Sequence, residues 1–183
     1  MGNFYVNHTV KTGDRDKVAA VLRHNKLAAY VSPVRNGCVV VAEEQADSQA
    51  TAPIVSLAKL LSIEVQAPVL AVLNHDDDAL LLGLYVSGQE VTDYSSDPDS
   101  IPEDKETSLA GKAAKLCAEF DASHAVETVT AILSSTWQTS YVFAYERHHA
   151  LVEALGLSDF AVCYGFGDLK DRPAEAFEWL KIP

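Results

Sequence analysis

The sequence predicts an α+β fold, namely a ferredoxin-like (split βαβ) antiparallel sheet that is extended by a β-meander and covered by C-terminal helices. Two observations support this prediction. Residues 69–73 and 79–86 are nearly continuous apolar runs, and 89–94 alternates polar with apolar side chains, which indicates three successive strands. The preceding segments read, in order, strand, helix, strand, strand and helix. Because strands that are apolar on both faces must be covered on both faces, we expect the 69–86 hairpin at the centre of the fold.

The first half of the chain supplies the alternating strand and helix signals. Asp14 ends the first strand signal and offers an N-cap to the helix that follows. The pair Asn36-Gly37 between two apolar runs is a strong signal for a tight hairpin turn. The predicted elements here are strands at 4–10, 27–34 and 38–42 and a helix at 15–25.

A second helix is predicted after the polar stretch 43–50, which we expect to be a solvated connection. Pro53 stands in the first helical turn, where its missing N–H has no cost. An apolar stripe at helical spacing then continues to about Glu64.

The second half of the chain reads as mainly helical. Residues 95–107 carry five acidic residues and two prolines and predict a surface loop. Gly156 stands where a left-handed helix C-cap is expected. The predicted division is a sheet unit at 1–94, an acidic linker at 95–108 and a helical subdomain at 109–183, packed together as one unit. Within the last part we expect helices at 109–120, 126–133 and about 143–155, a strand at 160–166 and a final helical turn or two at 173–180.

Composition narrows the classes of function. The 183 residues include 26 acidic and 14 basic side chains, a net charge of −12, which disfavours nucleic acid and anionic membranes as partners and favours a basic protein. The apolar runs are too short for a membrane helix, and no secretory signal is recognised, so we expect a cytoplasmic protein. Cys38, Cys117 and Cys163 each lie in an apolar run and are expected in the core.

The most acidic run beside the predicted central strands is His75-Asp76-Asp77-Asp78. We expect a solvated turn here, because Asn and Asp favour turns. A hard cation is the alternative, but neighbouring side chains of an extended segment point apart, so only Asp76 and Asp78 would converge on it.

The densest cluster of residue types used in catalysis is Glu146-Arg147-His148-His149. On a helix, His148 shares the apolar face and is expected to be buried, while the other three are expected on a solvated face. Neighbouring histidines lack the i, i+4 spacing of a zinc pair. The sequence therefore predicts no metal site and no catalytic residue in this cluster.

Two further patterns have a structural interpretation. The run Gly165-Phe166-Gly167-Asp168 lacks the third glycine of a dinucleotide fingerprint and predicts a tight turn. An aromatic set near the acidic loop favours core packing over a binding surface, and it comprises Tyr94, Trp137, Tyr141, Phe143 and Tyr145. The stretches VLNHDDDALLLGLY and YVFAYERHHALVEALGL resemble bacterial cytosolic proteins in character, and no family of known activity is implied.

These observations favour a non-enzymatic protein-binding or regulatory module of the immunity or inhibitor type, without a cofactor. The alternative is a small metal- or substrate-binding enzyme that uses carboxylates and histidines near Asp76 and His148. A third hypothesis, from fold analogy, is a ligand-sensing module that forms a homodimer through its sheet. The candidate binding residues are Asp76, Asp77, Asp78, Asp97, Asp99, Tyr94, Tyr141, Glu146 and His149.

Overall fold

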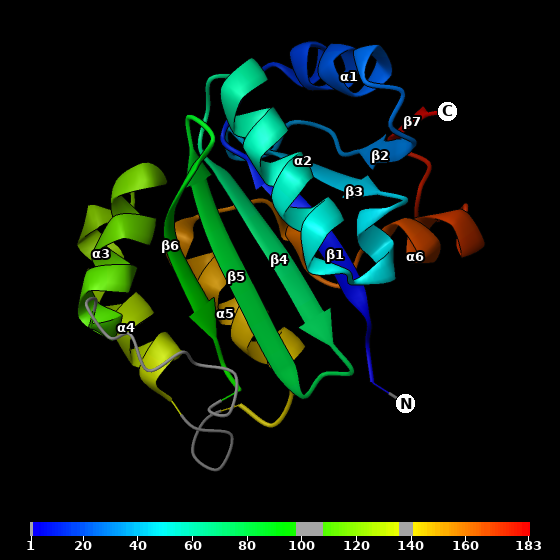
Figure 1. The fold of residues 1–183 in the computed structure, drawn as a ribbon. Coiled ribbons are helices and arrows are strands. Elements are labelled where there is room, and N and C mark those ends of the chain that lie inside the picture. Colours follow the sequence, from blue (N-terminus) through cyan, green and yellow to red (C-terminus); the bar gives the residue numbers. More distant parts are fainter. Residues whose placement is uncertain (1, 98–107, 136–140) are drawn as a thin grey trace.

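The computed structural model describes residues 2–97, 108–135 and 141–183, and its framework is one seven-stranded sheet (Figure 1). The strand order is β6-β5-β4-β1-β3-β2-β7, and every neighbouring pair is antiparallel. The chain is therefore α+β with an open antiparallel sheet, as predicted. The strands are β1 (Tyr5–Val10), β2 (Ala29–Val31), β3 (Val39–Glu43), β4 (Val69–His75), β5 (Ala79–Val86), β6 (Gln89–Ser95) and β7 (Leu180–Ile182).

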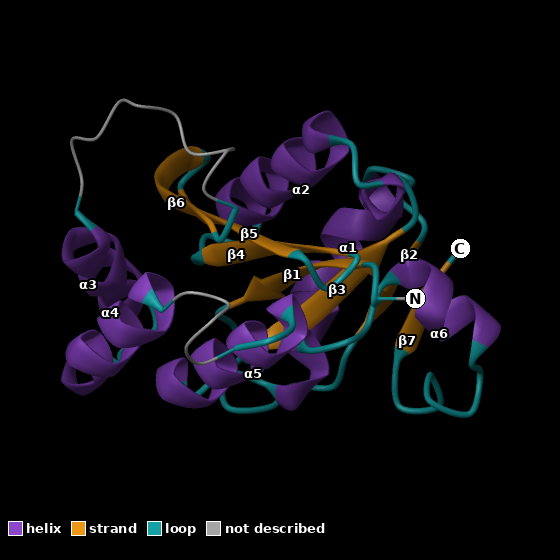
Figure 2. Ribbon diagram, turned by 90° about the horizontal axis from the view of Figure 1, so that it is seen from below, coloured by secondary structure: helices purple, strands orange, loops and turns teal. Residues whose placement is uncertain are grey.

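Helices cover both faces of this sheet (Figure 2). One face carries α1 (Arg15–His24) and α2 (Thr51–Glu64), which bury an almost wholly aliphatic layer against it. The other face carries helices of the second half, which bury a larger layer that includes aromatic side chains. These helices are α3 (Leu109–Glu119), α4 (Val126–Ser134), α5 (Ala144–Leu155) and α6 (Phe166–Asp171). The β4–β5 hairpin is interior and not central as expected, because β1 is the middle strand of the sheet. α2 and α5 contact both of its strands, which explains their apolar runs.

Local signals in the sequence form the predicted turns and caps. The side chain of Asp14 accepts a hydrogen bond from the Lys17 N–H and so caps α1. Asn36 and Gly37 both have positive φ, 53° and 71°, as the tight hairpin between β2 and β3 requires. Gly156 ends α5 in the left-handed conformation, as expected.

The predicted strand at 160–166 is wrong. This stretch contains a short 3-10 helix, η4 (Asp159–Ala161), and the beginning of α6. The amide of Asn7 donates to the carbonyls of Ala161 and Tyr164, so these backbone groups bind a side chain of the sheet instead of a neighbouring strand.

The predicted tight turn at residues 165–168 is also wrong, because α6 begins there. The carboxylate of Asp47, in the 3-10 helix η1 (Ala46–Ser48), accepts hydrogen bonds from the Phe166 and Gly167 N–H groups at this helix start. Gly165 lies too close to Asp47 for a side chain, because a Cβ there would be 2.7 Å from its Oδ1 atom.

The prediction of a final helical turn or two at 173–180 is wrong as well. Residues 173–179 form turns, and β7 follows as a strand that pairs with β2 through Ile182–Ala29 and Leu180–Val31. Pro173 has no backbone N–H, so it cannot donate the hydrogen bond that would continue α6. The outer side of β2 has unpaired backbone groups, with which β7 can pair. The C-terminal segment therefore extends the sheet that the first half begins.

Within the described ranges, no helix combines the length and the apolar composition needed to cross a membrane.

Candidate functional site

The β4–β5 turn is the meeting point of three segments. Asp76 and Asp77 both have positive φ, 52° and 59°, and Asp77 is buried. One carboxylate oxygen of Asp77 accepts hydrogen bonds from the backbone and side-chain nitrogens of Asn3, and the other accepts from the Asn74 amide. The expected solvated turn is therefore correct for Asp76 and Asp78, which are exposed, and wrong for Asp77, which anchors the N-terminal segment.

The third segment at this turn is the start of α5. The Ala144 N–H donates to the Asp77 carbonyl at 2.7 Å, which joins the helix to the turn. Glu146 accepts hydrogen bonds from the Val142 and Phe143 N–H groups at 2.9 and 3.1 Å. Glu146 is thus half-buried and caps its own helix, instead of lying on a freely solvated face.

Apolar side chains are exposed on both sides of this turn. Phe4 packs edge-on against His75 with ring centroids 5.3 Å apart. On the α5 side, Val142 is 72% exposed and Phe143 is 46% exposed, although the sequence favoured a core position for Phe143. We define the turn surface as these exposed residues together with the two exposed carboxylates, namely Phe4, His75, Asp76, Asp78, Val142 and Phe143.

The two histidines of α5 differ as predicted. His148 is fully buried, and its Nδ1 atom lies 2.7 Å from the Tyr5 hydroxyl. Burial, with a smaller effect of His149, lowers the pKa of His148 to about 3, and burial raises the pKa of Tyr5. His149 is exposed, with Glu153 at 3.8 Å.

The described residues do not support the metal hypothesis for Asp76 and His148. His148 faces Tyr5, and both oxygens of the nearby Asp77 carboxylate already accept hydrogen bonds. In the described part of the chain, no group of three or more His, Cys, Asp or Glu side chains is placed to hold a metal ion.

Arg147 was predicted on a solvated face, and this prediction is wrong. Its exposed fraction is 5%, so it is buried. Its guanidinium donates to the Tyr94 hydroxyl at 2.7 Å and to the carbonyls of Ile132 and Ser135 at 2.9 and 2.7 Å. The last carbonyls of α4 have no partner within their own helix, so Arg147 satisfies them from α5. The Tyr141 ring lies 5.4 Å from the same guanidinium.

The remaining predicted binding and aromatic residues differ in burial. Tyr94 is buried, and its hydroxyl donates to the Leu133 carbonyl, so it joins β6 to α4. Tyr141 and Tyr145 are half-buried. Asp97 is half-buried, whereas Asp99 and Trp137 lie outside the described residues.

The cysteine prediction holds for two of the three thiols. Cys38 and Cys117 are buried, and Cys163 is half-buried with a φ of 65°. Burial raises the pKa of all three thiols, to about 11 for Cys38, which disfavours the reactive thiolate form.

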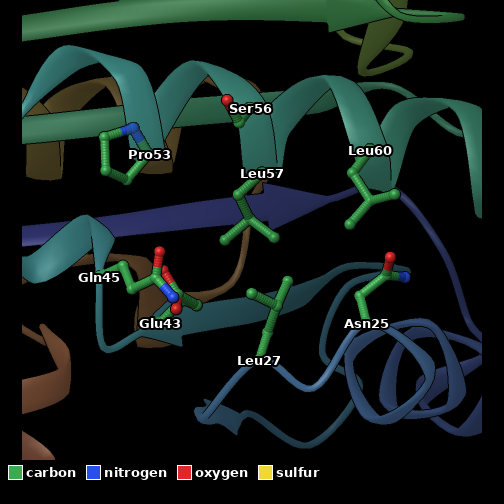
Figure 3. Close-up of a pocket in the computed structure, with 8 residues that line it drawn as sticks. All are labelled: Asn25, Leu27, Glu43, Gln45, Pro53, Ser56, Leu57 and Leu60. Carbon is green, nitrogen blue, oxygen red and sulfur yellow. The ribbon is translucent and has the colours of Figure 1, made fainter.

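A pocket that no sequence pattern indicated lies between α2 and the end of β3 (Figure 3). Its volume is about 210 Å³. Glu43 belongs to the polar stretch that was expected to be solvated, yet its exposed fraction is only 2%. In Figure 3, Leu57 extends from α2 toward Leu27, and Glu43 and Gln45 lie together at one end. The complete lining is Asn25, Leu27, Glu43, Gln45, Pro53, Ser56, Leu57 and Leu60.

Comparison with family models, with curated proteins and with solved structures finds no match to this chain.

Proposed function

We propose that this protein is a non-enzymatic module that binds a basic protein partner through the turn surface. The observation that carries this proposal is the exposure of Val142 and Phe143 beside the exposed carboxylates of Asp76 and Asp78. Large apolar side chains with a polar rim are typical of protein interfaces. The rigid turn below them, joined to Asn3 and Ala144 by hydrogen bonds, supports a preorganised surface.

Charge favours a partner rich in Lys and Arg. Asp76 and Asp78 take part in no salt bridge among the described residues. A basic partner gives them counter-charges, and the net charge of −12 accelerates its approach. A basic partner is what we expect if this protein is a regulator of the immunity or inhibitor type, which would block that partner.

The fold and the compartment complete this proposal. The order β4-β1-β3-β2, with α1 and α2 on one face, supports a ferredoxin-like core that β5, β6 and β7 extend at its two edges. Three free cysteines agree with a cytoplasmic protein.

The test compares variants of the turn surface with matched variants elsewhere. The full-length protein captures partners from a lysate of its native cells at low salt, and association kinetics are then measured with each purified candidate. Asp76→Asn with Asp78→Asn is expected to slow association, and Phe143→Ser to speed dissociation. Glu64→Gln with Asp171→Asn, and Phe177→Ser, are controls with the same chemical change at other exposed positions.

The expected partner is basic, and its association rate falls steeply with added salt. A captured protein whose kinetics respond equally to the turn-surface variants and the controls would contradict the proposed surface. Capture of no protein at low salt would contradict the protein-binding function itself.

A further inference from the structure

The pocket between α2 and the end of β3, which we call the α2 pocket, has walls suited to an apolar side chain. Leu27, Pro53 and Leu60 are half-buried there, and Leu57 is buried. Packing another apolar group on these walls removes their remaining surface from water, which is favourable. A cavity of about 150 Å³ accommodates benzene, so the volume of about 210 Å³ accommodates one phenyl ring.

The exposed charges around the α2 pocket are mainly basic. Lys26 lies between two lining residues of the loop after α1, and Lys59 follows the lining residue Ser56 by one helical turn. Both lysines are exposed, and neither takes part in a salt bridge among the described residues. Glu44 is the one exposed acidic residue among the sequence neighbours of the lining. The rim is therefore locally basic on a chain whose net charge is −12.

The turn surface has the complementary features, namely an exposed aromatic ring and two exposed carboxylates. We propose that the turn surface of one copy docks in the α2 pocket of a second copy. The Phe143 ring enters the pocket, and the carboxylates of Asp76 and Asp78 face Lys26 and Lys59. Every copy carries both patches, so the contact requires no further component. This inference rests on the proposed function, because it uses the same surface.

The contact joins two different patches and is therefore heterologous, so it continues from copy to copy unless the assembly closes into a ring. It involves one aromatic ring and a few charged groups, less than a standard interface, so we expect a dissociation constant of roughly 0.1 mM. The net charge of −12 opposes self-association and favours a basic partner. A second copy therefore covers the turn surface at high concentration and yields it to the basic partner.

The experiment measures the average mass of the full-length protein by analytical ultracentrifugation between about 10 µM and about 1 mM, and this mass is expected to rise with concentration. Phe143→Ser removes the ring, and Ser56→Glu places a carboxylate at the pocket opening, where it repels Asp76 and Asp78. Each change should weaken the contact at least about tenfold. Far-UV circular dichroism verifies that both variants are folded.

The matched controls are Phe177→Ser and Thr128→Glu, which make similar changes at other exposed positions. Both controls are expected to associate as the unmodified protein does.

The decisive measurement mixes the two defective variants. The Ser56→Glu copy retains an intact turn surface, and the Phe143→Ser copy retains an intact pocket, so one contact can form between them. The average mass of an equal mixture should exceed that of either variant alone and should level off at the mass of a dimer.

Three outcomes overturn the proposal. The first is a monomer mass at all concentrations up to about 1 mM. The second is equal association of the two variants and their controls. The third is a mixture no heavier than its separate components. None of these outcomes contradicts the proposed function, which depends on capture of a basic partner from the lysate.

Discussion

The side chains of β1 face two different environments. Those that face α1 and α2 lie in an aliphatic layer, in which His8 is the polar exception and donates to the Ile54 carbonyl. Those on the opposite face include Asn7, which donates to the irregular segment after α5. The two sets are Val6, His8 and Val10 toward α1 and α2, and Tyr5, Asn7 and Thr9 toward the second half of the chain.

The difference follows from what covers each face. α1 and α2 are regular helices, whose backbone groups are mostly satisfied internally, so the sheet presents mainly apolar side chains to them, and His8 with its bond to the Ile54 carbonyl is the exception. On the other face, helix ends and turns leave carbonyl groups unpaired. Asn7, Tyr94 and Arg147 supply the missing donors there. An irregular cover therefore requires polar side chains beneath it, and the following experiments test this rule or compare the two faces.

The largest effect is expected for Arg147→Met. This change removes the Arg147 donor of the half-buried Ser135 carbonyl and one of the two donors of the Ile132 carbonyl, which also accepts from the Ser135 hydroxyl, so the free energy of unfolding should fall by about 3 kcal/mol. Urea denaturation measures the change. Arg172→Met is the control, because Arg172 makes only exposed salt bridges and its loss should cost less than about 1 kcal/mol. Equal effects of the two changes would show that Arg147 does not support the irregular cover.

The pH dependence of stability tests the buried histidine on each face of the sheet, His8 on one and His148 on the other. Burial lowers the pKa of His8 to about 4 and of His148 to about 3, so the unfolded chain binds protons that the folded chain does not. Each histidine should therefore stabilise the fold above about pH 6.5 and lose this contribution as the pH falls toward its folded pKa. Between about pH 7 and about pH 5 the expected loss is about 2 kcal/mol per histidine.

His8→Gln and His148→Gln isolate these contributions from the carboxylates, which titrate in every variant. Each change should reduce the loss of unfolding free energy between these two pH values by about 2 kcal/mol. A pH dependence identical to that of the unmodified protein would show that the histidine is protonated in the folded state.

A smaller effect, about 1–2 kcal/mol of destabilisation, is expected for Asn7→Leu, which removes the donor to Ala161 and Tyr164. Thr9→Val, on the same face of the same strand, should be neutral or stabilising, because the buried Thr9 hydroxyl has no hydrogen-bond partner among the described residues. Equilibrium unfolding in urea compares the two. If both changes destabilise equally, packing rather than hydrogen bonding decides this face.

The smallest effect concerns the exposed edge of the second face. Lys112 of α3 donates to the carbonyl and the carboxylate of Asp93 on β6, both at 2.8 Å. The Asp93 side chain is well exposed, so Asp93→Asn should cost only about 0.5 kcal/mol. A double-mutant cycle with Lys112→Met measures the coupling, and a value well above about 1 kcal/mol would mean that this edge also depends on polar support.

The contrast between the regular cover of α1 and α2 and the irregular cover of the other face also explains which elements could be predicted from the sequence. The elements of the first half were located correctly, because the Asp14 cap, the Asn36-Gly37 turn and the periodicity of α2 are local signals. The segments at 160–166 and 173–180 were assigned wrongly, because their conformation depends on Asn7 and on the outer edge of β2. Neither partner can be inferred from the segments themselves.

The candidate site was predictable to a similar extent. The turn at Asp76 and Asp78 and the burial of His148 follow from turn chemistry and helix periodicity. The burial of Arg147 does not, because its partners Tyr94, Ile132 and Ser135 are distant in the sequence, and the burial of Glu43 was missed although its partner, the Ala46 N–H, is local. Sequence spacing contains no information on the distant partners of Arg147.

The pairing of β7 with β2 has a consequence for the order in which the protein assembles. Ile182 pairs with Ala29, so this edge of the sheet closes only after residues 180–182 have left the ribosome. Until then, the outer side of β2 presents unpaired backbone groups that another nascent chain can bind. During synthesis, β2 is therefore expected to be an open sheet edge until β7 is added.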